Sequence, residues 1–225
     1  MATVALSAQT KTMLKYVVRE PSVKNGEPPL LLLLHGVGSN EHDLFSFADR
    51  LPGEFLMVSA RAPHALGQDS YGWYSVDFSS GKPVYDAQQA EESRKLIISF
   101  LDELHAAHPF DRKRVFLCGF SQGAIMSYSV ALTRPDLVAG IAVMSGRLLD
   151  DVKPMIKAPP ELSSLKVLIS HGTQDPVLPI SGAEQANAYL RSLGISAALK
   201  TYPAGHTISA AALEDLVAWL SAALR

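Results

Sequence analysis

Residues 115–123 read Val-Phe-Leu-Cys-Gly-Phe-Ser-Gln-Gly, a short apolar run that ends in a Gly-x-Ser-x-Gly pattern. An apolar, helix-like stretch over 124–132 follows at once, so this order predicts a buried strand, a tight turn and a buried helix. At such a turn the serine backbone is strained and its hydroxyl stands above the carboxyl edge of a sheet. Gly119 and Gly123 lack side chains that would clash where strand and helix pass close together. Ser121 is therefore the candidate nucleophile, with an ordinary glycine-rich turn as the alternative until partners for the serine are found.

Strands and helices alternate along the whole chain. Apolar strand patterns lie at 14–18, 30–34, 55–60, 115–118, 138–144, 166–170 and 197–202, and helix patterns lie around 44–51, 87–108, 124–132, 186–193 and 209–220. This alternation predicts an α/β fold, with one mostly parallel sheet covered by helices on both faces, in a single domain over residues 1–225. The loops that follow parallel strands share one edge of the sheet, where ligands bind. Every candidate site residue lies in such a loop.

Composition excludes several classes of protein. The chain has 225 residues, of which 48% are hydrophobic and 19% charged, and its net charge is −2, so it is globular and offers no nucleic-acid-binding surface. Cys118, its only cysteine, excludes an internal disulfide and is expected to be a small buried side chain. Residues 1–14 show no signal peptide, and 30–34 is too short to span a membrane. We expect a cytoplasmic protein, either a monomer or a homodimer.

A serine hydroxyl needs an adjacent base before it becomes a good nucleophile at neutral pH. In a strand–turn–helix hydrolase the partners follow the serine in the order acid, then histidine. His206 lies in the loop after the last predicted strand, and Asp175 lies in the loop after the strand before it. Either residue alone would be read as an ordinary loop residue, but their joint placement favours a Ser121–His206–Asp175 triad. His171 lies too close to its strand end and is interpreted as structural.

The tetrahedral intermediate of such a reaction needs fixed hydrogen-bond donors for its oxyanion. We expect the backbone N–H groups of Gln122 and, in the loop 35–38, of Val37. The glycines of that loop would also begin a dinucleotide-binding fingerprint, but Glu41 occupies the place of the third glycine. The histidines have no metal-ligand spacing, so neither a cofactor nor a metal is expected.

The motifs together resemble the phospholipase/carboxylesterase family of α/β-hydrolases, which includes the acyl-protein thioesterases. The matching segments are Leu34-His35-Gly36-Val37-Gly38, Arg61-Ala62-Pro63-His64, Gly72-Trp73-Tyr74, Gly119-Phe120-Ser121-Gln122-Gly123, Ser145-Gly146-Arg147-Leu148, His171-Gly172-Thr173-Gln174-Asp175-Pro176-Val177 and Gly205-His206. The Arg-Ala-Pro and Ser-Gly-Arg-Leu segments are similar to the bacterial carboxylesterase branch. The resemblance implies hydrolysis of carboxylic esters or thioesters through an acyl-enzyme, without a large cap domain, by the triad and oxyanion amides named above. Thr207 occupies a position at which relatives often carry an acidic residue.

These observations predict a serine carboxylesterase acting on small-molecule or acyl esters. A thioesterase or lysophospholipase on the same triad is the alternative within the class, and a non-catalytic binding protein of the same fold is the alternative outside it. An apolar substrate pocket is expected from the side chains of Trp73, Tyr71, Leu148 and Leu178. Packing beneath a long loop would explain the same side chains equally well.

Overall fold

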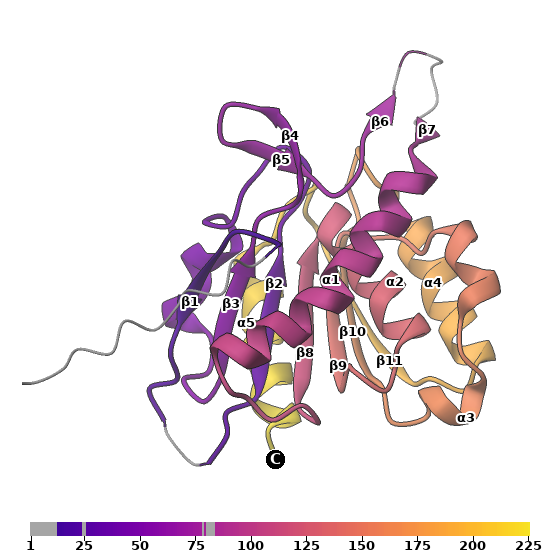
Figure 1. Cartoon of the computed structure of the whole chain (residues 1–225). Coiled ribbons are helices and arrows are strands. Elements are labelled where there is room, and N and C mark those ends of the chain that lie inside the picture. The colour runs from indigo at the N-terminus through magenta and orange to yellow at the C-terminus, as the bar shows by residue number, and fades with distance from the viewer. Residues whose placement is uncertain (1–12, 24–25, 78, 80–83) are drawn as a thin grey trace, which may run out of the picture.

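A seven-stranded sheet runs through the molecule in the order β1-β3-β2-β8-β9-β10-β11 (Figure 1). The structure is a computed structural model that describes residues 13–23, 26–77, 79 and 84–225. Most of residues 1–14, where no signal peptide is expected, therefore lie outside the described residues. The strands are β1 (Tyr16–Arg19), β2 (Leu30–Leu34), β3 (Leu56–Ala60), β8 (Val115–Phe120), β9 (Gly140–Met144), β10 (Lys166–Gly172) and β11 (Ala197–Tyr202). β1 pairs with β3 in antiparallel register, and all other neighbours are parallel, which confirms the predicted α/β class.

Helices cover both faces of the sheet. α1 (Ala87–Ala107), α2 (Gln122–Thr133) and α4 (Ser181–Ser192) pack on one face, whereas the 3-10 helix η1 (Leu44–Arg50) and α5 (Ala210–Ala223) pack on the other (Figure 1). β2 is buried on both sides, because Leu30, Leu32 and Leu34 join the first core and Leu31 and Leu33 join the second. A continuous leucine run is the pattern that such a central parallel strand requires.

Side-chain caps begin two of the helices, α1 at Asp86 and α5 at Ser209. The Ser209 hydroxyl accepts a hydrogen bond of 3.2 Å from the N–H of Ala212 at the start of α5, as expected of a cap. The expected helix over 44–51 is instead the 3-10 helix η1, and the Asp43 side chain does not cap it. The Asn40 side chain is used earlier, since its oxygen accepts from the N–H of His42 at 2.9 Å.

The described parts of the long connection 61–86 form two short strand pairs above the carboxyl edge of the sheet (Figure 1). β4 (His64–Gly67) pairs with β5 (Ser70–Gly72), and β6 (Val76–Asp77) pairs with β7 (Val84–Tyr85). The connection before β10 holds η2 (Asp150–Met155) and the single-turn helix α3 (Pro159–Leu162). The described residues include no separate cap domain. Among their helices, none has both the length and the apolar character that crossing a bilayer requires.

Candidate active site

Ser121 occupies the sharp turn between β8 and α2. Its backbone has φ 53° and ψ −117°, outside the regions that non-glycine residues favour, and its N–H donates to the carbonyl oxygen of Met144 at 2.9 Å. A Cβ on Gly119 would lie 2.2 Å from the carbonyl oxygen of Gly123, and one on Gly123 would lie 1.9 Å from that of Leu34. Both glycines are therefore required by close backbone approach, and the turn lifts the serine hydroxyl to the carboxyl edge.

The structure brings the three residues of the predicted triad together. The Ser121 Oγ lies 3.0 Å from Nε2 of His206, and Nδ1 of the same ring lies 2.7 Å from Oδ2 of Asp175. Because β10 and β11 are neighbours, the loops after them meet beside the turn after β8. With the proton on Nδ1, the imidazole donates to the carboxylate and accepts from the serine hydroxyl.

Asp175 is held as a carboxylate by its surroundings. Its side chain has no exposed surface, and Oδ1 accepts hydrogen bonds of 2.9 Å from the N–H groups of both Val177 and Leu178. Burial raises the pKa of this carboxyl, but hydrogen bonds from His206 and the two N–H groups outweigh it and keep the pKa below its usual value. The negative charge that orients the imidazole is thus present at neutral pH.

His171 reinforces the acid loop without contacting the serine. Its Nε2 lies 2.7 Å from the carbonyl oxygen of Leu178, to which it donates, and 3.5 Å from Oδ2 of Asp175. Its side chain is fully buried. This position agrees with the structural role expected for His171.

The two residues expected to supply the oxyanion donors are close to the serine, one in sequence and one through its neighbour Gly36. Gln122 opens α2, so its N–H belongs to the unsatisfied first turn of that helix. Gly36 lies against the nucleophile, since a Cβ added to it would be 3.3 Å from the Ser121 Cβ, and Val37 follows it. No backbone acceptor among the described residues takes the N–H of Val37 or Gln122. Both N–H groups thus lack a backbone partner among the described residues, and their role as oxyanion donors stays a prediction.

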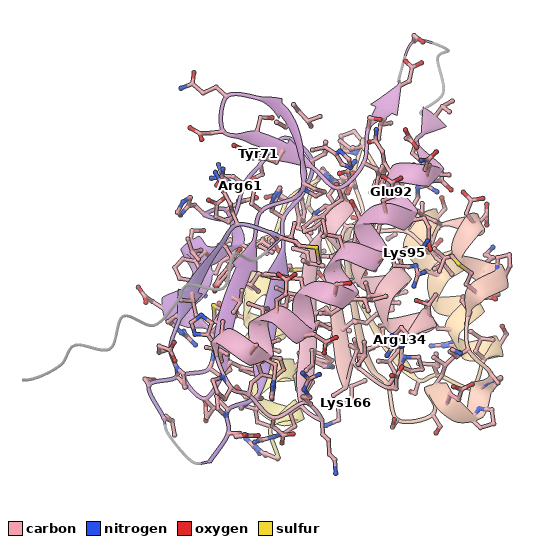
Figure 2. All side chains as sticks on the ribbon, in the orientation of Figure 1. Arg61, Tyr71, Glu92, Lys95, Arg134 and Lys166 are labelled. Atoms are coloured by element: carbon pink, nitrogen blue, oxygen red, sulfur yellow. The ribbon has the colours of Figure 1, made fainter. Side chains whose placement is uncertain are left out.

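A buried ion pair anchors the loop that carries Val37. The Glu41 carboxylate accepts two hydrogen bonds of 2.5 Å from the Arg61 guanidinium, which also donates to the Tyr71 hydroxyl at 2.9 Å and lies 4.4 Å from the centre of that ring. Figure 2 shows Arg61 and Tyr71 together below the β4–β5 hairpin. The Tyr71 backbone accepts from the N–H of Gly38 at 2.8 Å and donates to Ser39 at 2.9 Å. Sequence reasoning missed this pairing.

A second network fixes the base of the same loop. His35 accepts from the N–H of Ala62 at 3.0 Å and donates from Nδ1 to the next carbonyl oxygen, and burial lowers its pKa, so the ring stays neutral. The Trp73 indole N–H donates to the His35 carbonyl at 2.9 Å. The Gln122 side chain accepts from the Trp73 backbone at 3.0 Å and donates to the carbonyl of Tyr74 at 2.8 Å. Sequence reasoning considered only the backbone of Gln122.

The four expected pocket residues belong to one region, the core on the α1–α2 face. Trp73 is fully buried and forms part of that core, which corresponds to packing beneath the loop. Tyr71, Leu148 and Leu178 are half-buried and pack against it. A substrate-lining role for these three side chains stays a prediction.

Comparison with known proteins identifies the family to which this architecture and these motifs belong. The sequence model of the Phospholipase/Carboxylesterase family matches residues 15–224. Carboxylesterase SOBER1 of Arabidopsis thaliana is 29% identical over 208 residues, covering 87% of this chain and 90% of that protein. Acyl-protein thioesterase 1 of Eremothecium gossypii is 32% identical over 216 residues, covering 86% and 87%. The crystal structure of esterase PE8 superposes with a TM-score of 0.78 at 30% identity, covering 93% of this chain and 98% of that one.

The family match spans almost the whole described chain, and the triad residues follow the ends of β8, β10 and β11. The chain therefore belongs to the phospholipase/carboxylesterase family and is a hydrolase of the α/β-hydrolase fold.

Proposed function

We propose that the protein is a serine carboxylesterase that hydrolyses carboxylic esters through an acyl-enzyme. Ser121 is the nucleophile, His206 the general base and then the general acid, and Asp175 the residue that orients the imidazole. The N–H groups of Val37 and Gln122 bind the oxyanion. The reaction needs no cofactor, because these groups supply every proton transfer and all the charge stabilisation.

The acylation half-reaction follows from the hydrogen-bond chain. The Ser121 Oγ attacks the carbonyl carbon and its proton passes to Nε2 of His206, giving an imidazolium opposite the Asp175 carboxylate. When the tetrahedral intermediate collapses, the bond to the alcohol oxygen breaks, and that oxygen leaves with the bonding electrons and takes the proton from Nε2. Water then attacks the acyl-enzyme by the same route and releases the carboxylic acid.

The single observation that supports this function is the continuous chain Ser121 Oγ–His206–Asp175, with contacts of 3.0 and 2.7 Å, beside two N–H groups that lack a backbone partner among the described residues. A non-catalytic binding protein would have no need to hold the serine in a strained conformation next to a base.

Labelling by a fluorophosphonate and hydrolysis of short-chain p-nitrophenyl esters test the proposal together. The wild type should be labelled and active, and Ser121→Ala should lose the label and several orders of magnitude of kcat while retaining its circular dichroism spectrum. Ser129→Ala is the matched control, because it removes a buried hydroxyl from α2, the helix after Ser121, where the group donates only to the carbonyl oxygen of Ile125. Turnover by Ser121→Ala equal to that of the control would refute the nucleophile, and an unlabelled, inactive wild type would support the binding protein.

Thioester hydrolysis is the second candidate, because one relative at 32% identity is an acyl-protein thioesterase. The same triad attacks either carbonyl, so the acyl group and leaving group decide the preference. A chain-length series of oxygen esters assayed beside the matching acyl thioesters measures it. A kcat/KM consistently higher for thioesters would reassign the substrate class.

We also propose that the protein acts in the cytoplasm. Its sole cysteine, Cys118, is free and buried, and such usage suits a reducing compartment. Cell fractionation beside marker proteins for each compartment tests this, and recovery with secreted proteins would contradict it.

A further inference from the structure

A groove opens beside His206 on the face of the sheet opposite the expected apolar substrate pocket. It has a volume of about 150 Å³ and is lined by Asp43, Leu44, Phe47, Phe120, His206, Thr207 and Ile208. Four of these side chains are large and apolar, and they join or flank the core under η1 and α5. The groove is open to solvent, and its exposed lining contains polar as well as apolar atoms.

The groove adjoins one of the reacting groups, His206. His206, whose Nε2 lies 3.0 Å from the Ser121 Oγ, forms part of its wall. Phe120, the residue before the nucleophile, lies with its ring centre 4.9 Å from the centre of the His206 ring. A molecule in the groove would thus lie beside the imidazole.

The chemistry of acylation determines which part of an ester belongs there. His206 must deliver its proton to the departing alcohol oxygen, so the rest of the alcohol has to extend from a point next to the imidazole. The acyl part is bonded to Ser121 at that moment and has the Tyr71, Leu148 and Leu178 side on the other core available to it. The two ends of the substrate therefore have separate places on the two faces of the sheet.

Asp43 gives the groove a charge preference. Its carboxylate forms no hydrogen bond or ion pair with the described residues, and the residue is exposed. Among the lining side chains only Asp43 and His206 are titratable. An unpaired carboxylate at the edge of the groove favours a bound cation and disfavours a bound anion.

We propose that this groove is the leaving-group subsite, and that it selects esters of apolar alcohols, preferring a cationic over an isosteric neutral alcohol through Asp43. This inference rests on the serine esterase function proposed above. It assigns Phe47 and Ile208 to shape recognition and Asp43 to charge recognition.

Four acetate esters with one acyl group test shape and charge separately: those of ethanol, benzyl alcohol, choline and 3,3-dimethylbutanol, the last two being isosteric. Phe47→Ala should lower the benzyl to ethyl ratio of kcat/KM about tenfold. Phe45→Ala is the matched control, because Phe45 is equally half-buried on η1 but does not line the groove.

Asp43→Asn should lower the choline to dimethylbutyl ratio of kcat/KM about fivefold, and added salt should lower the same ratio for the wild type. Asp49→Asn removes the same charge from another position on η1 that does not line the groove, and it should leave the ratio unchanged. Neither Phe47→Ala nor Asp43→Asn should alter the preference among ethyl esters of different acyl length, because the acyl part lies elsewhere.

The outcomes separate this inference from the function on which it rests. Loss of fluorophosphonate labelling in Ser121→Ala, together with unchanged alcohol selectivity in Phe47→Ala and Asp43→Asn, would overturn the subsite and leave the esterase intact. A change of acyl-length preference in Phe47→Ala would also overturn it, since the groove would then hold the acyl chain. A wild type that hydrolyses none of the four esters and takes no label would overturn the esterase function itself.

Discussion

The Glu41–Arg61 pair should contribute strongly to folding stability, and Glu41→Gln isolates that contribution. The substitution keeps the shape of the side chain but leaves the guanidinium without its counter-charge. Only 7% of the Glu41 side chain and 18% of the Arg61 side chain are exposed, so water can replace the lost partner only in part. Removing one member of such a buried pair costs about 3–5 kcal/mol.

The lower end of this range applies here, because Arg61 keeps its hydrogen bond to the Tyr71 hydroxyl and some contact with solvent. A loss of about 3 kcal/mol lowers Tm by about 6–12 °C in a chain of this size. Thermal unfolding followed by circular dichroism at neutral pH measures the shift. Asp102→Asn is the control, because it breaks the exposed pair with Arg112 and should cost no more than about 1 kcal/mol.

Acidification offers a second test of how much the Glu41–Arg61 pair contributes to folding stability. The hydrogen bond from Arg61 holds the pKa of Glu41 below its usual value, despite burial. The stability from the pair is therefore complete above the unfolded-state pKa of about 4.3 and is lost as pH falls through the lower folded-state value. The Tm difference between wild type and Glu41→Gln should shrink between pH 7 and pH 3. A Tm within about 2 °C of wild type at pH 7, or a difference that grows on acidification, would refute the reasoning.

Three further substitutions or reagents test the site and the core. Gly123→Ala should abolish the native circular dichroism spectrum, because the new Cβ would lie 1.9 Å from the carbonyl oxygen of Leu34. Gly67→Ala is the control and should fold, because its Cβ would meet no atom closer than 3.9 Å. A folded Gly123→Ala protein would contradict the close approach of the backbone. Asp175→Asn should lower kcat by about 10⁴ with little change in KM, since the imidazole loses the acceptor that fixes its tautomer, and a kcat within tenfold of wild type would exclude that role. Cys118 should not react with iodoacetamide until the protein unfolds, because burial raises its pKa to about 12, and stoichiometric alkylation of the native protein would disprove this.

The parts of the structure that sequence predicts well are those with strong local signals. The five leucines of β2 are apolar at every position, so their burial does not depend on which face of the sheet each one meets. Gly119 and Gly123 indicate the turn at Ser121, because close backbone approach leaves no room for a side chain at either position. The order of Ser121, Asp175 and His206 along the chain, one per strand end, was enough to predict that they meet.

The parts that sequence missed depend on contacts between distant segments. Glu41 and Arg61 are each unremarkable in their own surroundings, and only the folded chain brings them into a bidentate pair. The hairpins of the connection 61–86 have strands of two to four residues, too short for a periodic pattern. Trp73 reads as a pocket residue by composition, and its burial against His35 is a property of the tertiary fold.

The main chain at Ser121, with φ 53° and ψ −117°, has a consequence for anyone who evolves this protein in the laboratory. Such a conformation costs a non-glycine residue about 1–3 kcal/mol, and glycine escapes most of that cost. A screen that selects for thermostability alone will therefore enrich glycine at position 121 and yield inactive enzymes. Folding stability and catalytic turnover therefore make opposite demands on residue 121. Libraries screened for thermostability should keep serine there and vary other positions.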